Sequence, residues 1–230
     1  MSATFYSSPT LAAWRHAAGA DWTRYTNHAF VQGLGDGTLP QASFHYYLIQ
    51  DYIFLIHFTR AWALAVVKSE SLSEMRLAAA SVDALINHEM QLHMDICKKV
   101  GISEDQLFQA EESVENLTYT RFVMDAGLSG DFLDLMAALA PCIFGYGEIG
   151  LALNNSATRS TPYQQWIDTY SGDEYQGLCT TLGDMIELAA LSRIGPEPMA
   201  SPRWTNLCKR FHMATKLEIN FWAMGLRGHE

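Results

Sequence analysis

The chain has 230 residues, 49% of them apolar, and a formal net charge of −10 at pH 7. This length and composition are typical of a globular protein with a sizeable core and exclude a disordered chain. No run of Lys and Arg offsets the acidic balance, so nucleic acid and an anionic membrane surface are not expected as partners.

Cysteine spacing and hydropathy narrow the class of protein further. The four cysteines, at positions 97, 142, 179 and 208, are widely spaced and form no C-x-x-C motif. This spacing favours reduced thiols in a cytoplasmic protein over a zinc ribbon or a disulfide framework. The first ten residues do not resemble a secretory signal, and no run of 18 uncharged apolar residues appears. We therefore expect neither secretion nor a membrane span.

Cap, glycine and proline signals divide the chain into predicted helices. The expected ranges, in chain order, are about 9–19, 21–34, 41–68, 72–100, a short turn from 103, 115–128, 132–155, 163–170, 173–193 and 201–225. No alternating strand pattern, internal repeat or linker is apparent. The sequence therefore predicts one all-α domain over residues 1–230, a bundle of long helices with a pocket between them.

Cys142 lies within the apolar pattern of the predicted helix 132–155. Tyr146 follows four residues later, so the thiol and the phenol share one face of that helix. A thiol in such company is a candidate nucleophile, although a free cysteine is more often a buried core residue. Pro141 removes a backbone hydrogen bond from the helix. Gly145 and Gly147 leave space beside the thiol, which suits either a pocket or a plain helix crossing.

Two acidic residues lie in apolar stretches. Bulky apolar residues surround Asp51 in the sequence, so its carboxylate must be paired or hydrogen-bonded. It either ties two helices together or accepts hydrogen bonds from the N–H groups of a ligand. Apolar neighbours of Glu218 would raise its pKa and suit it to proton transfer. The alternative is an exposed carboxylate beside Lys216.

The segment from His88 to His93 has the spacing H-E-x-x-x-H, which does not bring the two histidines together on a helix. Glu89 and His93 are four residues apart and could share a metal ion, but a mixed polar helix face is the simpler interpretation. No phosphate-binding loop and no nucleophile elbow is present. Aromatic residues are core by default, yet they could stack on a flat heterocycle.

In order and spacing, several of these segments resemble the TenA family, also called thiaminase II or aminopyrimidine aminohydrolase. The resemblance covers nearly the whole chain. The segments that carry it are Gln50-Asp51, Tyr119-Thr120, Pro141-Cys142 with Tyr146, Tyr163-Gln164-Gln165-Trp166-Ile167-Asp168-Thr169-Tyr170, and Glu218 with Phe221. It implies a haem-oxygenase-like all-α bundle with a central pocket, commonly assembled as a homotetramer.

The resemblance also implies roles for individual residues. Cys142 matches the family nucleophile, Glu218 its acid/base, and Asp51 the carboxylate that holds the aminopyrimidine. The matching pocket aromatics are Tyr119, Tyr146, Tyr170 and Phe221. Phe54 departs from a well-known branch, which has tyrosine three residues after the aspartate, so Phe54 would offer stacking surface without a hydroxyl. The thiol at position 142 resembles the cysteine-containing branch.

The implied reaction is a hydrolysis in thiamin salvage. Cys142, as thiolate, adds to an electron-poor carbon of a stacked pyrimidine, while Asp51 accepts from the amino edge and Glu218 handles a proton. The amine leaves the exocyclic methylene, water replaces it, and the thiol departs. The product is 4-amino-5-hydroxymethyl-2-methylpyrimidine, from an aminomethyl-pyrimidine or from thiamin. No metal or organic cofactor is required.

Two other functions stay open at the level of the sequence. One is a helical oxidase of the same architecture, either cofactor-free like pyrroloquinoline quinone synthase or with two irons held by Glu89, His93, His57 and Glu148. The other is a regulatory protein that binds a pyrimidine without turnover, for which Cys142 is unnecessary.

Overall fold

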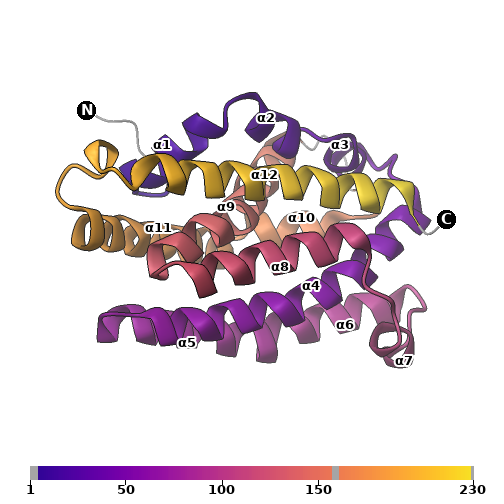
Figure 1. Cartoon of the computed structure of the whole chain (residues 1–230). Coiled ribbons are helices and arrows are strands. Elements are labelled where there is room, and N and C mark those ends of the chain that lie inside the picture. Colours follow the sequence, from indigo (N-terminus) through magenta and orange to yellow (C-terminus); the bar gives the residue numbers. More distant parts are fainter. Residues whose placement is uncertain (1–4, 157–160, 229–230) are drawn as a thin grey trace.

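The computed structural model describes residues 5–156 and 161–228, which form a bundle of helices (Figure 1). A π-helical turn, η1 (Leu85–Glu89), and a 3₁₀ turn, η2 (Pro198–Ala200), interrupt the series. The α-helices are α1 (Pro9–Ala18), α2 (Ala20–Thr26), α3 (Ala29–Asp36), α4 (Gln41–Lys68), α5 (Leu72–Ala84), α6 (Met90–Lys99), α7 (Glu104–Phe108), α8 (Val114–Ser129), α9 (Phe132–Ser156), α10 (Gln164–Ser171), α11 (Asp173–Ile194) and α12 (Trp204–Arg227).

Side-chain caps fix the starts of several helices where the sequence predicts them. The Ser8 hydroxyl accepts a hydrogen bond from the Leu11 N–H at the start of α1. Ser71 caps α5 in the same way, and Ser103 opens α7 with a complete capping box. The predicted long helix 41–68 is present as α4 with those bounds. The all-α prediction is confirmed.

Two predicted helices differ from the structure. The expected helix 21–34 is two helices, because the chain breaks at Asn27 and the His28 ring then caps α3 by accepting from the Phe30 N–H. The expected helix 72–100 is interrupted between α5 and α6 by the π-helical turn that ends at Glu89. Such turns are short, often lie at functional sites, and have no simple sequence signature.

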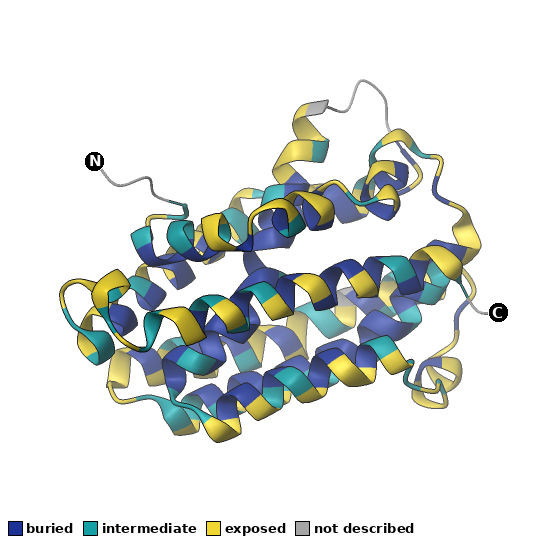
Figure 2. Cartoon of the chain, turned by 45° about the horizontal axis from the view of Figure 1, so that its top comes forward, coloured by how far each residue is buried: buried dark blue, intermediate teal, exposed yellow. Residues whose placement is uncertain are grey.

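Helix α9 is the central element, and it packs against α8, α10, α11 and α12. Between Leu135 and Ala140 no residue is more than 1% exposed. By length and composition its segment Phe132–Asn155 could cross a membrane, but 78% of the tested window is buried inside the protein. The hydropathy of this helix is therefore explained by its position in the core, where the buried faces of the surrounding helices meet (Figure 2).

The glycines of α9 serve close helix crossings. A Cβ atom at Gly145 would lie 2.1 Å from the Tyr25 ring, and one at Gly147 would lie 2.6 Å from the Tyr6 hydroxyl. The Tyr25 hydroxyl donates a hydrogen bond to the Pro141 carbonyl at 3.3 Å. Of the two alternatives, a pocket or a helix crossing, these glycines therefore serve the helix crossing. They do not create the space beside the Cys142 thiol.

Candidate active site

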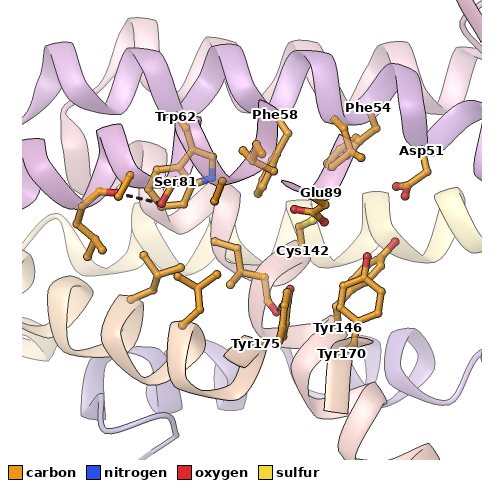
Figure 3. A pocket seen from close by; sticks show the side chains of 18 residues that line it. Asp51, Phe54, Phe58, Trp62, Ser81, Glu89, Cys142, Tyr146, Tyr170 and Tyr175 are labelled. Atoms are coloured by element: carbon orange, nitrogen blue, oxygen red, sulfur yellow. Dashed lines mark hydrogen bonds between the residues drawn. The ribbon is translucent and has the colours of Figure 1, made fainter. Parts of the chain in front are cut away.

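A cavity of about 240 Å³ lies between α4, α5, η1, α9, α10 and α11 (Figure 3). Asp51 and Tyr170 line one end of it, Cys142 and Glu89 its middle, and Trp62 lies near the other end. Most of the lining is apolar or aromatic, with a few polar groups. Small-molecule sites typically have this composition.

Helix α4 forms one wall of the cavity from a single face. Asp51, Phe54, Phe58 and Trp62 all line the cavity and are spaced by three or four residues. Residues at this spacing lie above one another on a helix. The register of α4 therefore sets the order of groups along the cavity, from the carboxylate at one end to the indole at the other.

Cys142 and Glu218 meet from two different helices, α9 and α12. The thiol donates a hydrogen bond to the Glu218 carboxylate, and the Tyr119 hydroxyl donates a second one to Glu218 Oε1 at 2.8 Å. Glu218 is only 1% exposed. This placement contradicts the alternative of an exposed carboxylate beside Lys216. Cys142, by contrast, keeps some surface facing the cavity.

The environment keeps both groups protonated near neutral pH. Burial raises the pKa of Glu218 to about 8, against the opposing effect of its Tyr119 hydrogen bond. Burial, and next the negative charge of Glu218, raise the pKa of Cys142 well above its usual value. The resting sulfur is therefore a thiol, and the protonated Glu218 carboxyl lies within hydrogen-bonding reach of it.

Asp51 is buried with two polar neighbours. The Tyr47 hydroxyl donates to Asp51 Oδ2 at 3.3 Å, and His93 Nδ1 lies 3.5 Å from the same oxygen. His93 Nε2 contacts the Leu48 carbonyl, which can only accept, so Nε2 carries the proton and in the neutral ring Nδ1 is an acceptor. Burial raises the pKa of Asp51 to about 7 and lowers that of His93 to about 4. Asp51 thus ties α4 to α6, and its carboxyl also lines the cavity, which leaves the interpretation as a ligand acceptor a prediction.

The five expected pocket aromatics do not all reach the cavity. Tyr146, Tyr170 and the divergent Phe54 line it. Tyr119 and Phe221 lie behind Phe54, with ring centroids 5.1 Å and 5.6 Å from its ring. These two support the wall, and Tyr119 also holds Glu218.

Several residues of the site were missed by sequence reasoning. Tyr47 lies one turn before Asp51, and its hydroxyl is 3.4 Å from that of Tyr146 and accepts from Trp166 Nε1 at 3.2 Å. The spacing on α4 could have indicated Tyr47, as well as Phe58 and Trp62 in the wall. Tyr175 of α11 also lines the cavity, and no sequence signal links that helix to Cys142.

The four residues expected to hold two irons are not assembled. Glu148 accepts hydrogen bonds from Arg15 at 2.6 and 2.8 Å and from Trp22 at 3.0 Å. His57 lies beside Arg121 and 3.5 Å from Glu112. Glu89 and His93 do approach each other, but no group of three metal-ligating side chains occurs among the described residues.

The sequence matches the profile of the TENA/THI-4/PQQC family over residues 16–228. The chain belongs to this family. An aminopyrimidine aminohydrolase of Halalkalibacterium halodurans is 34% identical over 205 residues, 88% of this chain and 89% of that protein. The Bacillus subtilis protein of the same name is 31% identical over 214 residues, 93% of this chain and 88% of that protein.

Solved structures of TenA proteins agree with the fold. A TenA family transcription regulator from Silicibacter sp. TM1040 is 56% identical, has a TM-score of 0.93, and matches over 95% of this chain and 97% of its own. A TenA homologue from P. horikoshii is 25% identical with a TM-score of 0.85, over 96% of this chain and 99% of its own. The resemblance to the TenA family and its helical bundle is thus confirmed.

Proposed function

We propose that the protein is an aminopyrimidine aminohydrolase that releases 4-amino-5-hydroxymethyl-2-methylpyrimidine in thiamin salvage. The observation that carries this proposal is the pairing of the Cys142 thiol with the buried Glu218 carboxyl beside an aromatic cavity that also contains Asp51. Relatives at 31% and 34% identity over most of the chain are named for this activity.

In the proposed reaction the pyrimidine ring stacks among the aromatic residues of the cavity, and Asp51 accepts a hydrogen bond from its amino group. The protonated Glu218 gives its proton to a ring nitrogen and takes the thiol proton in its place, as the sulfur bonds to an electron-poor ring carbon. Covalent addition divides one difficult displacement at the exocyclic methylene into easier steps.

The adduct then expels the amine, and water bonds to the exocyclic methylene. Glu218 gives its proton to the departing sulfur and takes the proton back from the ring nitrogen. The ring regains its aromaticity, and the resting thiol and carboxyl are restored.

A product assay with an aminomethyl-pyrimidine and thiamin, run side by side, tests the proposal. We expect hydroxymethyl-pyrimidine from at least one of them, with ammonia or the thiazole as the second product. The ratio of the two rates identifies the preferred substrate. Binding of both pyrimidines with no release of product would contradict the proposal. It would favour a pyrimidine-binding regulator. The Silicibacter protein is named as a TenA family transcription regulator.

We also propose that the chain forms a homotetramer in the cytoplasm. Large apolar side chains are exposed, among them Val67 at 78%, Val114 at 75% and Leu188 at 67%, and partner copies would cover such groups. All four cysteines are free, as expected in a reducing compartment. Sedimentation should give four times the chain mass of 25.7 kDa, and a monomer at micromolar concentration would contradict the assembly.

A further inference from the structure

The cavity contains a third carboxyl group, which the reaction above leaves unused. Glu89 is the last residue of the π-helical turn η1, and it lines the middle of the cavity. Figure 3 shows its carboxylate next to Cys142. Its charge acts on the Cys142 thiol and on the hydroxyls of Tyr170 and Tyr175.

Glu89 differs from the other two carboxyl groups in its lack of a partner. Glu218 is held by Tyr119 and Asp51 by Tyr47, whereas Glu89 makes no hydrogen bond or ion pair with any residue that the structure describes. Glu89 is half-buried at the cavity wall, and a carboxyl partly removed from water without a partner is costly. The π-helical turn that carries it is a feature found most often at functional sites. The missing partner and the π-helical turn both indicate that the Glu89 carboxyl interacts with a ligand.

The groups that face Glu89 come from every neighbouring element, and none of them is a cation at neutral pH. They are Asp51 of α4, His93 of α6, Cys142 and Tyr146 of α9, Tyr170 of α10 and Tyr175 of α11. Burial, and secondly the charge of Asp51, raise the pKa of Glu89 to about 7. A carboxyl with this pKa can both give and take a proton near neutral pH.

A second, smaller cavity lies on the other side of Glu89. Its volume is about 30 Å³, and Asp51, Glu89, His93 and Tyr170 are among the residues that line it. A polar cavity needs about 10–15 Å³ of such volume to hold a water. Asp51, Glu89 and Tyr170 line both cavities. The Glu89 carboxyl thus borders the larger cavity and also a smaller one with room for water.

Beyond Glu89 the larger cavity continues as an apolar arm. Phe58, Trp62, Leu77 and Leu182 line this part. Since the pyrimidine's amino edge is assigned to the Asp51 end, the group that leaves the exocyclic methylene would point toward Glu89 and the arm. The apolar lining of the arm would suit apolar substituents on the leaving nitrogen.

We propose that Glu89 is the general acid for the departing amine, an assignment that rests on the proposed function and completes its leaving-group step. The carboxyl proton moves to the nitrogen as the C–N bond breaks, and the electron pair of that bond stays on the nitrogen. The Glu89 carboxylate then takes a proton from the water whose oxygen bonds to the exocyclic methylene. The acid is thereby restored, and the amine leaves neutral.

The test compares Glu89→Gln with the wild type in single-turnover release of the leaving group. The substrates are 4-amino-2-methylpyrimidines whose exocyclic methylene carries one of five leaving groups. These are released as ammonia, an alkylamine, aniline, nitroaniline or the thiazole of thiamin. Ammonia and the alkylamine must be protonated to leave, nitroaniline depends least on protonation among the amines, and the thiazole needs no proton. General acid catalysis typically contributes about 10²–10⁴-fold.

We expect Glu89→Gln to slow release of ammonia and alkylamine by about 10²–10⁴-fold and release of the thiazole by less than about tenfold. Glu89→Asp keeps the acid and should recover part of the loss with the basic amines. Asp95→Asn, an exposed carboxyl change on the adjacent α6, is the matched control and should behave as the wild type.

Equal losses across the whole series, or no loss with the aminomethyl substrate, would overturn the assignment of Glu89. A purely structural role predicts the first of these results, because a displaced helix slows every substrate alike. A wild-type protein that releases no leaving group from any of the five compounds would overturn the proposed function and this inference together.

Discussion

At the scale of single residues, the site depends on where protons are held. Three carboxyl groups lie near one thiol, two of them buried (Asp51 and Glu218) and one half-buried (Glu89), and removal from water raises the pKa of each of the four groups. Raised pKa values favour the protonated, neutral forms of these groups in the resting state, which avoids buried charge. In the proposed reaction, the sulfur becomes a nucleophile as Glu218 passes its own proton to the ring and takes the thiol proton.

Asp51 and Glu218 should respond differently to amide substitution. Asp51→Asn presents an amide donor to the substrate's amino group, so both affinity and rate should fall. Glu218→Gln removes the acceptor for the thiol proton, so kcat should fall by about 10²–10⁴-fold with a smaller change in affinity. Steady-state kinetics and pyrimidine titrations measure both quantities. Unchanged affinity and pH–rate profiles in both variants would show that these roles are wrong.

Glu218 should also make the stability of the protein depend on pH. Its pKa rises from 4.5 in a model chain to about 8 in the folded protein, so between these values the unfolded state is ionised and the folded state is protonated. The free energy of unfolding should therefore fall as pH rises from 5 to 8, at most about 1.4 kcal/mol per pH unit from this group. Glu218→Gln should flatten the slope seen in urea titrations. A wild-type slope retained in full by the variant would contradict the burial of a neutral Glu218.

At the scale of elements, the proposed nucleophile Cys142 lies on α9, a helix that is packed on several sides. Its neighbours approach closely because glycine occupies the crossings, and this holds Cys142 in a fixed place against α12. The position of the thiol should thus depend on backbone packing as much as on the residues of the cavity.

Gly145→Ala should destabilise the protein strongly. The new Cβ would lie 2.1 Å from the Tyr25 ring, so the ring or the helix must move, and overpacking of this kind costs about 1–3 kcal/mol or more. Gly177→Ala, in α11, is the matched control, since its Cβ would meet nothing within 4 Å and alanine favours a helix by about 1 kcal/mol. Thermal unfolding should move in opposite directions for the two variants. Equal shifts would contradict the close crossing.

Phe54 tests the register of α4. It lies three residues after Asp51, lines the cavity, and stacks on Phe58 with centroids 5.5 Å apart. Phe54→Ala should weaken pyrimidine binding and cost about 3–5 kcal/mol of stability, because a buried ring is lost. Phe54→Tyr should change affinity by about 1 kcal/mol, the net value of one hydrogen bond. Equal pyrimidine affinity in all three proteins would place Phe54 outside the binding site.

Helix signals in the sequence were sufficient for α4 and for most helix starts, because caps and apolar periodicity are local. The break at Asn27 and His28 was not predicted, since an imidazole cap lies outside the usual capping residues. The π-helical turn at Glu89 was also missed, and with it the direction of that side chain. Periodicity assumes an unbroken α-helix, so it favoured a mixed polar helix face for Glu89.

At the scale of the whole molecule, the cavity draws its residues from helices that are far apart in the sequence, from Asp51 in α4 to Leu182 in α11. The resemblance to the TenA family supplied expectations for Cys142, Glu218 and Asp51. The apolar arm could not be predicted, because it arises where α5 and α11 approach α4. The small second cavity beside Glu89 could not be predicted either, because it arises where η1 and α6 meet α4 and α10. Cavities of this kind depend on tertiary packing, so no local pattern in the sequence indicates them.

The most direct test of the central claim is single-turnover hydrolysis of the aminomethyl-pyrimidine by the wild type and by Cys142→Ser, with folding checked by circular dichroism. Covalent catalysis through the thiol predicts that the serine variant binds the pyrimidine but forms hydroxymethyl-pyrimidine several orders of magnitude more slowly. Turnover by Cys142→Ser within about tenfold of the wild type would contradict a nucleophilic role for this residue.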